Sequence, residues 1–327
     1  MTGVSVVLCC YNSAPRLEET LGCLAAQKVP EGLPVEVILV NNASTDNTVD
    51  VARKVWGRHN TGFHFRIVEE PAPGHLNARI KGVAEARYDL ILFCDDDNCL
   101  HDQYINRAVA IMNDHPRVGA LGGKGIGVSD PGMPEWFAKH QSIYACGEQA
   151  SQDGICTDRN YLWGAGLVCR RDILAKVFNP DYPLIATGRT QSHLFSGDDV
   201  EICGRIILLG YDLYYTASLL FRHWMPVNRL TSLYLQELRK GVSRATPVKR
   251  LYSYAILRSK NRGIVLFLIF VQHLFRYIGL KIKIIKPQSV AIVNPLKVYI
   301  EGIRKTGPYH SEYLKINKFA HYARTHL

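Results

Sequence analysis

The chain has 327 residues, of which 47% are hydrophobic and 21% are charged. This composition is ordinary for a globular protein, and a low-complexity chain is excluded for the first 250 residues. The length allows one large domain, or one domain with an appendage, and no internal repeat is visible.

The formal net charge is +10, and the positive charge is concentrated near the C-terminus. No Asp or Glu occurs between Glu237 and Glu301, whereas Lys and Arg recur throughout that stretch. A basic and apolar segment favours contact with an anionic surface, such as phospholipid headgroups, a lipid-linked diphosphate or a nucleic acid. The alternative is an ordinary solvated basic face.

The nine cysteines include no CxxC pair and no Cys-His cluster with zinc-binding spacing. Several lie in apolar, strand-like runs, so we expect them to be reduced and buried, as in a cytosolic protein. The run Val4–Cys10 indicates the first strand of a fold and not a signal peptide, because no basic segment precedes it and no cleavage site follows it.

Apolar runs and amphipathic segments alternate along the first hundred residues. We expect a helix that begins at Pro15. We also expect strands at residues 4–10, 35–40, 63–68 and 88–93, and helices at residues 49–55 and 75–86. This alternation predicts a doubly wound α/β sheet, in which ligands bind outside the carboxyl ends of the strands. Tyr11, Asn41 and Asp95–Asp97 follow such strand ends.

The pattern loosens after residue 100. We expect helices at residues 101–113, 171–177 and 198–209, strands at residues 118–127, 162–170 and 212–219, an irregular polar region at 129–158 and a loop at 187–196. Residues 1–230 are predicted to form the main domain, with a nucleotide-binding half (1–100) and an acceptor-side half (101–230). Residues 231–327 are predicted to form a basic, partly amphipathic helical extension.

The apolar run at residues 264–271 has basic flanks and is too short to span a bilayer. We expect it to lie in a membrane interface, and the alternative is a buried amphipathic helix.

Two acidic groups are the strongest chemical signals. Asp95–Asp97 are three adjacent carboxylates, which repel one another unless a cation neutralises them. Hard oxygen ligands suit Mg²⁺ or Mn²⁺, which usually share their coordination with a substrate phosphate. The alternative is a solvated turn with a helix cap. Asp198 and Asp199 begin a predicted helix, where simple helix capping is again the alternative.

Four segments, in the same order, resemble the motifs of family 2 glycosyltransferases: residues 6–12 (VVLCCYN), 42–48 (NASTDNT), 95–97 (DDD) and 197–201 (GDDVE). Together they cover roughly residues 4 to 225. The resemblance implies a GT-A fold, a nucleotide-diphosphate-sugar donor, a divalent metal and inversion at the anomeric carbon.

The resemblance also implies a metal site that binds Mn²⁺ or Mg²⁺. Asp97 is the expected direct ligand, Asp95 is expected to be a second ligand nearer the ribose, and His223 is expected to complete the shell. Asp96 could replace either acid, because three consecutive Asp residues leave the register open.

An inverting transfer needs a general base for the acceptor hydroxyl. The family pattern favours Asp199 as this base, with Asp198 in contact with the acceptor, and the closeness of the two acids would raise one of their pKa values. Trp163, Gly164 and Glu201 are assigned to the acceptor side, although Trp163 could equally be a core residue.

Donor recognition is expected from Tyr11, which would stack on the base, and from Asn41, which would bond its edge. Family members often carry Asp at the position of Asn41, and uridine is still the expected base. Further donor contacts are expected from Asn12, Asp46, Asn77, Arg79, Asp95 and Asp96. A helix-surface role is the alternative for Arg79.

These features predict the transfer of one sugar from a nucleotide-diphosphate sugar, a UDP-sugar, to a lipid-linked or glycan acceptor. Residues 236–240 (QELRK) resemble the QxxRW motif of processive synthases but carry Lys240 in place of Trp, which favours single-sugar addition. The expected location is the cytoplasm, either free or peripheral at the inner face of the cell membrane, with no nucleic-acid partner.

Two other classes of protein stay open. A sugar nucleotidyltransferase would need a Gly-rich phosphate loop where this chain has residues 11–13 (YNS). A non-catalytic basic module that binds nucleic acid or membrane would not need the two acidic groups.

Overall fold

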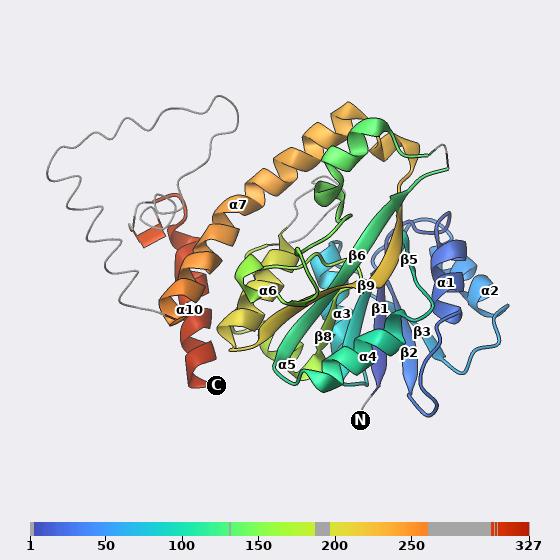
Figure 1. Cartoon of the computed structure of the whole chain (residues 1–327), viewed down its shortest axis with the longest axis horizontal. Helices are drawn as coiled ribbons and strands as arrows, with labels where there is room; N and C mark the ends of the chain where they lie inside the picture. The colour runs from blue at the N-terminus through green and yellow to red at the C-terminus, as the bar shows by residue number, and fades with distance from the viewer. Residues whose placement is uncertain are drawn as a thin grey trace, which may run out of the picture.

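One mixed β-sheet forms the centre of the protein in the computed structural model, which describes residues 3–130, 132–186, 197–260, 302–303, 305 and 307–326 (Figure 1). The strand order is β3-β2-β1-β4-β8-β6-β9-β5, and β7 pairs with β9. The strands are β1 (Val4–Cys10), β2 (Val35–Asn41), β3 (His64–Glu69), β4 (Leu90–Asp95), β5 (Asn98–Leu100), β6 (Val118–Val128), β7 (Gly154–Ile155), β8 (Val168–Arg170) and β9 (Asp212–Trp224).

The N-terminal half of the sheet is parallel, since β1 pairs in parallel with β2 and β4, and β2 pairs in parallel with β3. Its central strands are mostly apolar because helices cover both faces, and the buried Ser5 of β1 donates a hydrogen bond to the buried Glu36 of β2 at 2.7 Å. Successive side chains point to opposite faces, so Val7 and Ile38 belong to one hydrophobic cluster and Val6 and Val37 to the other.

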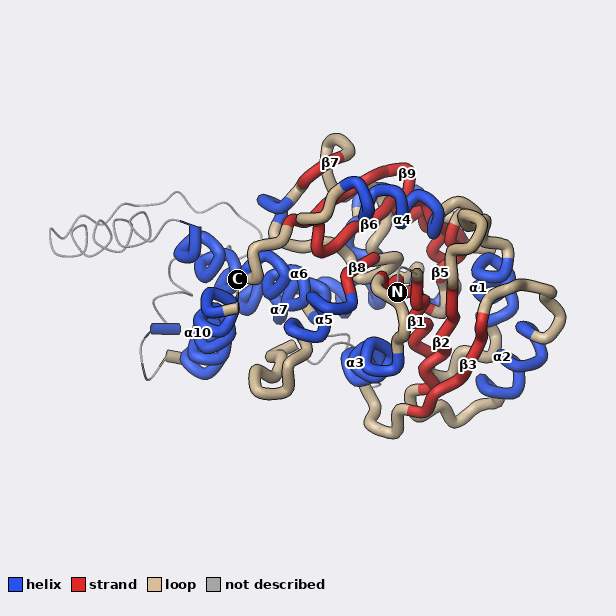
Figure 2. Tube along the Cα trace, turned by 90° about the horizontal axis from the view of Figure 1, so that it is seen from below, coloured by secondary structure: helices blue, strands red, loops and turns tan. Residues whose placement is uncertain are grey.

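Helices cover both faces of this sheet: α1 and α2 lie on one side of β1–β3, and α3 lies on the other (Figure 2). Their apolar side chains and those of α4 to α6 complete the two hydrophobic clusters. The α-helices that precede the C-terminal region are α1 (Leu17–Ala25), α2 (Thr48–Trp56), α3 (His75–Glu85), α4 (Tyr104–Asp114), α5 (Arg171–Val177) and α6 (Asp198–Leu208).

Two C-terminal helices, α7 (Ser232–Lys260) and α10 (His310–Thr325), pack against α6 and against each other (Figure 1). Tyr252 of α7 and Phe319 of α10 belong to the same buried cluster as Ile202 of α6. In the part of the chain that the structure describes, no helix is both long enough and apolar enough to cross a bilayer. The apolar run at residues 264–271 lies outside the described residues.

The prediction of a strand at residues 162–170 is wrong for most of its length, because only Val168–Arg170 is a strand. Gly166 has a φ of +69°, and this left-handed backbone interrupts extended structure. The structure also contains β5 directly after the three acids, where no strand was expected, and β5 pairs antiparallel with β9.

The expectation that all nine cysteines are reduced is also wrong. Cys23 of α1 and Cys99 of β5 form a disulfide, with their Cα atoms 5.3 Å apart. The physical reason is that α1 packs against β5, which brings residues 76 positions apart within bridging distance. The other seven cysteines are free, and five of them are buried.

Candidate active site

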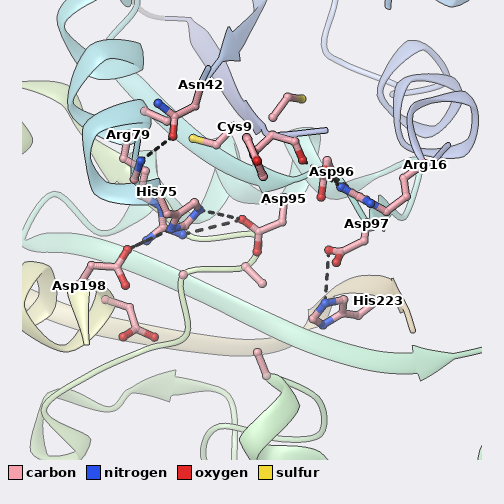
Figure 3. Close-up of a pocket in the computed structure, with 18 of the residues that line it drawn as sticks. Cys9, Arg16, Asn42, His75, Arg79, Asp95, Asp96, Asp97, Asp198 and His223 are labelled. Carbon is pink, nitrogen blue, oxygen red and sulfur yellow. Dashed lines mark hydrogen bonds and ion pairs between the residues drawn. The ribbon is translucent and has the colours of Figure 1, made fainter. Parts of the chain in front are cut away.

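A pocket of about 330 Å³ lies beyond the carboxyl ends of β1 and β4 (Figure 3). Parallel pairing places Cys9 of β1 opposite Asp95 of β4, so both strands deliver their next residues to the same edge. Nine of the residues predicted from the sequence line the pocket, and they are Tyr11, Arg79, Asp95, Asp96, Asp97, Gly164, Asp198, Asp199 and His223. Both acidic groups therefore line one pocket.

Asp97 lies between two cations. His223 Nε2 is 3.3 Å from Asp97 Oδ1, and Arg229 Nη1 donates to Asp97 Oδ2 at 2.8 Å. The antiparallel pairing of β5 and β9 sets Asn98 opposite His223, which explains how these distant residues meet. Burial opposes ionisation of Asp97, but the two cations hold its pKa well below the usual range. Although burial opposes a charged imidazole, Asp97 raises the pKa of His223 to about 10.

Asp96 points toward α1 and away from the other two acids (Figure 3). Its carboxylate accepts hydrogen bonds from Ser13 and from Arg16 Nε, the latter at 3.2 Å. Burial and the nearby charge of Asp97 raise the pKa of Asp96, in spite of Arg16. The structure therefore separates Asp96 from Asp95 and Asp97, which the sequence alone left equivalent.

His75 and Arg79, one turn apart on α3, connect the two acidic groups (Figure 3). His75 Nε2 is 3.4 Å from Asp95 Oδ1, and its Nδ1 is 3.2 Å from Asp198 Oδ2. Arg79 Nη1 donates to Asp198 Oδ2 at 3.0 Å, and Arg79 is only 2% exposed. Despite burial, the hydrogen bond from His75 lowers the pKa of Asp95.

Gly164 makes room for Arg79. A Cβ atom at this position would lie 2.3 Å from Arg79 Nη2, which is closer than real atoms approach. The guanidinium of Arg79 also stacks on the ring of Phe93, with its Cζ 4.9 Å from the ring centroid. Gly164, which was assigned to the acceptor side, therefore permits the close approach of a protein side chain, Arg79.

Six predicted residues lie outside the pocket lining: Asn12, Asn41, Asp46, Asn77, Trp163 and Glu201. Three of them stabilise turns. Asn12 Oδ1 accepts the backbone N–H of Thr45 at 2.8 Å, Asp46 Oδ1 accepts that of Thr48 at 3.0 Å, and Asn77 donates to the carbonyls of its own turn.

Glu201 and Trp163 are buried. Glu201 Oε2 accepts the backbone N–H groups of Ile185 and Ala186 at 2.8 and 2.7 Å, and its Oε1 accepts from Tyr252 at 2.8 Å. These contacts place Glu201 in the packing of α6 and not on the pocket. The guanidinium of Arg159 lies over the ring of Trp163, with its Cζ 5.3 Å from the ring centroid.

Among the pocket-lining residues that the sequence interpretation missed are three side chains that can carry positive charge and one tyrosine: Arg16, His75, Arg229 and Tyr234. His75 could have been predicted, because its i, i+4 spacing to Arg79 places both side chains on the same face of α3. Arg16 and Arg229 have no such signal, because their partners lie 80 and 132 positions away along the chain.

Comparison with known proteins decides the family. The model of glycosyl transferase family 2 matches residues 5–178, which is more than half of the chain. This chain belongs to glycosyl transferase family 2. The sequence prediction of the family is therefore confirmed.

Relatives of this family 2 glycosyltransferase include two staphylococcal enzymes. It is 28% identical over 122 residues to the poly-beta-1,6-N-acetyl-D-glucosamine synthase of Staphylococcus epidermidis, a match that covers 37% of this chain and 28% of that protein. The synthase of Staphylococcus aureus (strain COL) is 28% identical over 123 residues, which is 38% of this chain and 28% of the relative. The chain thus spans under a third of the length of these relatives.

Solved structures of low sequence identity share the fold. TarS 1-349 of S. aureus in complex with UDP-GlcNAc is 16% identical, with a TM-score of 0.54 and coverage of 99% of this chain and 88% of TarS. The mannosyltransferase PcManGT of Pyrobaculum calidifontis, in complex with GDP-Man and Mn²⁺, is 17% identical, with a TM-score of 0.50. The match covers 98% of this chain and 86% of PcManGT. The predicted GT-A fold is confirmed.

Proposed function

We propose that this chain transfers one sugar from a UDP-sugar to a hydroxyl group of a lipid-linked or glycan acceptor, with inversion and with the help of a divalent metal. The observation that carries the proposal is that Asp95–Asp97 and Asp198–Asp199 line one pocket. Glycosyl transfer needs positive charge beside the leaving diphosphate and a base beside the incoming hydroxyl. Membership of the family supports the same reaction.

Donor recognition is assigned to the ends of β1 and β2. Tyr11 lines the pocket, where its ring would stack on the base. Asn41 Nδ2 donates to Glu69 Oε2 at 2.7 Å, while Asn41 Oδ1 is buried with no hydrogen-bond partner among the described residues. The contact with Glu69 occupies the amide nitrogen, and the buried amide oxygen is the acceptor that we assign to the imino N–H of uracil, although Asn41 lies outside the lining of the pocket.

The acids of β4 and the loop after it fit a divalent metal. Asp97 and Asp95 would hold Mn²⁺ or Mg²⁺, with His223 as a further ligand. Mg²⁺ is usually bound by one or two carboxylates and completes its shell with substrate phosphates and water. The described residues contain no group of three or more side chains already arranged to hold a metal ion, so we assign the remaining positions of the shell to the donor diphosphate and water. When bound, the ion neutralises charge on the leaving diphosphate as a Lewis acid.

Three arginines place positive charge at the pocket: Arg16 beside Asp96, Arg79 beside Asp198 and Arg229 beside Asp97. Their ion pairs hold the acids in position before the donor binds, which reduces reorganisation during the reaction.

Asp199 is our choice for the general base. One oxygen of Asp198 already contacts Arg79 and His75, so Asp198 is committed to orienting the two sides of the pocket. Asp199 lines the same pocket and is less buried, and its Oδ1 accepts the backbone N–H of Val200 at 2.8 Å. The start of α6 therefore supplies one structural acid and one acid for the acceptor hydroxyl.

The acceptor and the location belong to the proposal as well. The named product of the staphylococcal relatives is a glycan, which agrees with an acceptor in surface polysaccharide synthesis. The Cys23–Cys99 disulfide removes the argument from reduced cysteines, so the cytoplasmic location that we propose rests on the basic, apolar C-terminal segment, which suits the anionic inner face of a membrane.

A donor screen tests this proposal. Release of nucleoside diphosphate is measured from UDP-, GDP- and other nucleotide sugars, with Mn²⁺, with Mg²⁺ and with a chelator. We expect metal-dependent release from a UDP-sugar, and a loss of roughly 10²- to 10⁴-fold in Asp199→Asn. Asp50→Asn, an exposed site on α2, is the control and should behave as wild type. Unchanged turnover in Asp199→Asn would remove the base assignment, and no release from any donor would remove the function.

A further inference from the structure

Two cationic side chains pack on one aromatic ring beside the pocket. The guanidinium Cζ of Arg159 is 4.7 Å from the ring centroid of Tyr161, and Lys249 Nζ is 4.0 Å from the same centroid. Arg159 ends a short 3₁₀-helix at Thr157–Arg159, whereas Lys249 lies on α7. Arg159 also lies over Trp163, so the two cations and two aromatic rings form one cluster.

This cationic pair differs from the other cations near the pocket. Arg16, Arg79 and Arg229 each form an ion pair with an Asp. Within residues 3–130, 132–186 and 197–260, no ion pair is found for Arg159 or Lys249, and Arg159 donates to the backbone carbonyls of Gln149 and Tyr161. Burial and the charge of Arg159 lower the pKa of Lys249, as expected for two like charges held close together.

The cationic pair lies on the acceptor side of the pocket. The charge of Asp199 acts on both Lys249 and Tyr161, which places the proposed general base close to the pair. Trp163 directly precedes Gly164, which lines the pocket. An acceptor whose hydroxyl reaches Asp199 therefore passes near Arg159 and Lys249.

We propose that Arg159 and Lys249 bind an anionic group of the acceptor, a phosphate or a carboxylate, beside the rings of Tyr161 and Trp163. Arg159 and Lys249 pack against the same ring with no ion pair to an acidic side chain among residues 3–130, 132–186 and 197–260, although the more distant charge of Asp199 acts on Lys249. A bound anion would offset the repulsion between the two cations. A guanidinium gives such an anion a planar, two-pronged contact and an ammonium adds a point charge. The identification of the bound anion as part of the acceptor rests on the proposed function. The binding of an anion by Arg159 and Lys249 does not depend on it.

Calorimetric titration with three probes tests the inference. The probes are a short oligo(glycerol phosphate), a hyaluronan tetrasaccharide that carries carboxylates, and neutral chitotetraose. The variants are Arg159→Gln, Lys249→Gln and the double variant. Arg244→Gln, which removes one exposed charge from the same helix, is the matched control, and Lys249→Arg preserves the charge.

We expect the wild type to bind at least one anionic probe more tightly than chitotetraose, and more weakly as salt is raised. Each Gln variant should lose roughly ten- to a hundredfold in affinity for that probe, whereas Arg244→Gln and Lys249→Arg should retain it. The probe that binds, phosphate or carboxylate, identifies the anion. Thermal unfolding of each variant verifies that the fold is intact.

Equal binding of the anionic probe by the wild type and the double variant would overturn the inference, as would the absence of binding to both anionic probes. The proposed function is tested separately, by measuring hydrolysis of the nucleotide-sugar donor in the absence of any acceptor. The control variant Arg244→Gln should leave that hydrolysis unchanged, because this side chain is exposed and does not line the pocket.

Discussion

Gly164 and Arg79 are in direct contact, and the lack of a side chain at residue 164 is what allows the Arg79 guanidinium to reach Asp198. Arg79 comes from α3, which connects β3 and β4, whereas Gly164 belongs to the loop before β8. The loop and the helix therefore fit together at the point where the two acidic groups meet. A small change at residue 164 should act on the acids through Arg79.

Gly164→Ala should displace Arg79 from Asp198. We expect a loss of about 1–3 kcal/mol in the free energy of unfolding from overpacking, and a fall in turnover on the order of a hundredfold from the misplaced acids. Denaturant unfolding and donor turnover measure the two effects. Gly62→Ala is the control, since nothing lies within 4 Å of a Cβ there. Wild-type activity in Gly164→Ala would contradict the role of this contact.

Asp97→Asn and Asp96→Asn should differ in their response to metal. Asp97 contacts His223, whereas the carboxylate of Asp96 contacts Arg16 and Ser13 on the other side. We expect Asp97→Asn to lose roughly 10³-fold in metal-activated turnover, because the substitution removes a preorganised charge from the metal site. High Mn²⁺ should not restore this turnover. Asp96→Asn should retain activation by Mn²⁺ with a similar midpoint. A Mn²⁺ titration of turnover for both variants compares them, and the reverse order would move the ligand assignment to Asp96.

Tyr252→Phe should weaken the attachment of α7 to α6. The Tyr252 hydroxyl donates to Glu201 Oε1 at 2.8 Å and accepts from Arg205 Nε at 3.2 Å, and all three side chains are buried. Loss of one buried hydrogen-bonding group should reduce the free energy of unfolding by about 1–3 kcal/mol. Urea unfolding measures this change. A difference below about 0.5 kcal/mol would show that α7 does not depend on this network.

Reduction of the Cys23–Cys99 disulfide should destabilise the protein. The bond closes a long loop, with 76 positions between its ends, and such a constraint contributes about 2–4 kcal/mol to the free energy of unfolding. Unfolding with and without a reductant measures the difference. Thiol titration of the denatured, unreduced protein should find seven free thiols. Nine reactive thiols under those conditions would show that the disulfide does not form.

The sequence alone was sufficient for the order of elements in the parallel half of the sheet. Runs such as Val4–Cys10 and Val35–Asn41 are mostly apolar because both faces of these strands are buried, and this requirement can be recognised from neighbouring residues in the sequence. The same local logic placed Asp95 at a strand end and Asp198 at a helix start. Acidic residues at those positions, in family order, predicted a shared site, and the structure places both groups on one pocket.

Only the tertiary structure decided how the side chains of this site are paired. Three adjacent Asp residues look equivalent in sequence, but Arg16 and Ser13 engage Asp96, while His223 and Arg229 engage Asp97. Glu201 follows two pocket acids along the chain, yet the helical turn directs it into the core. Such choices depend on contacts between segments far apart in the chain, which short-range periodicity does not encode.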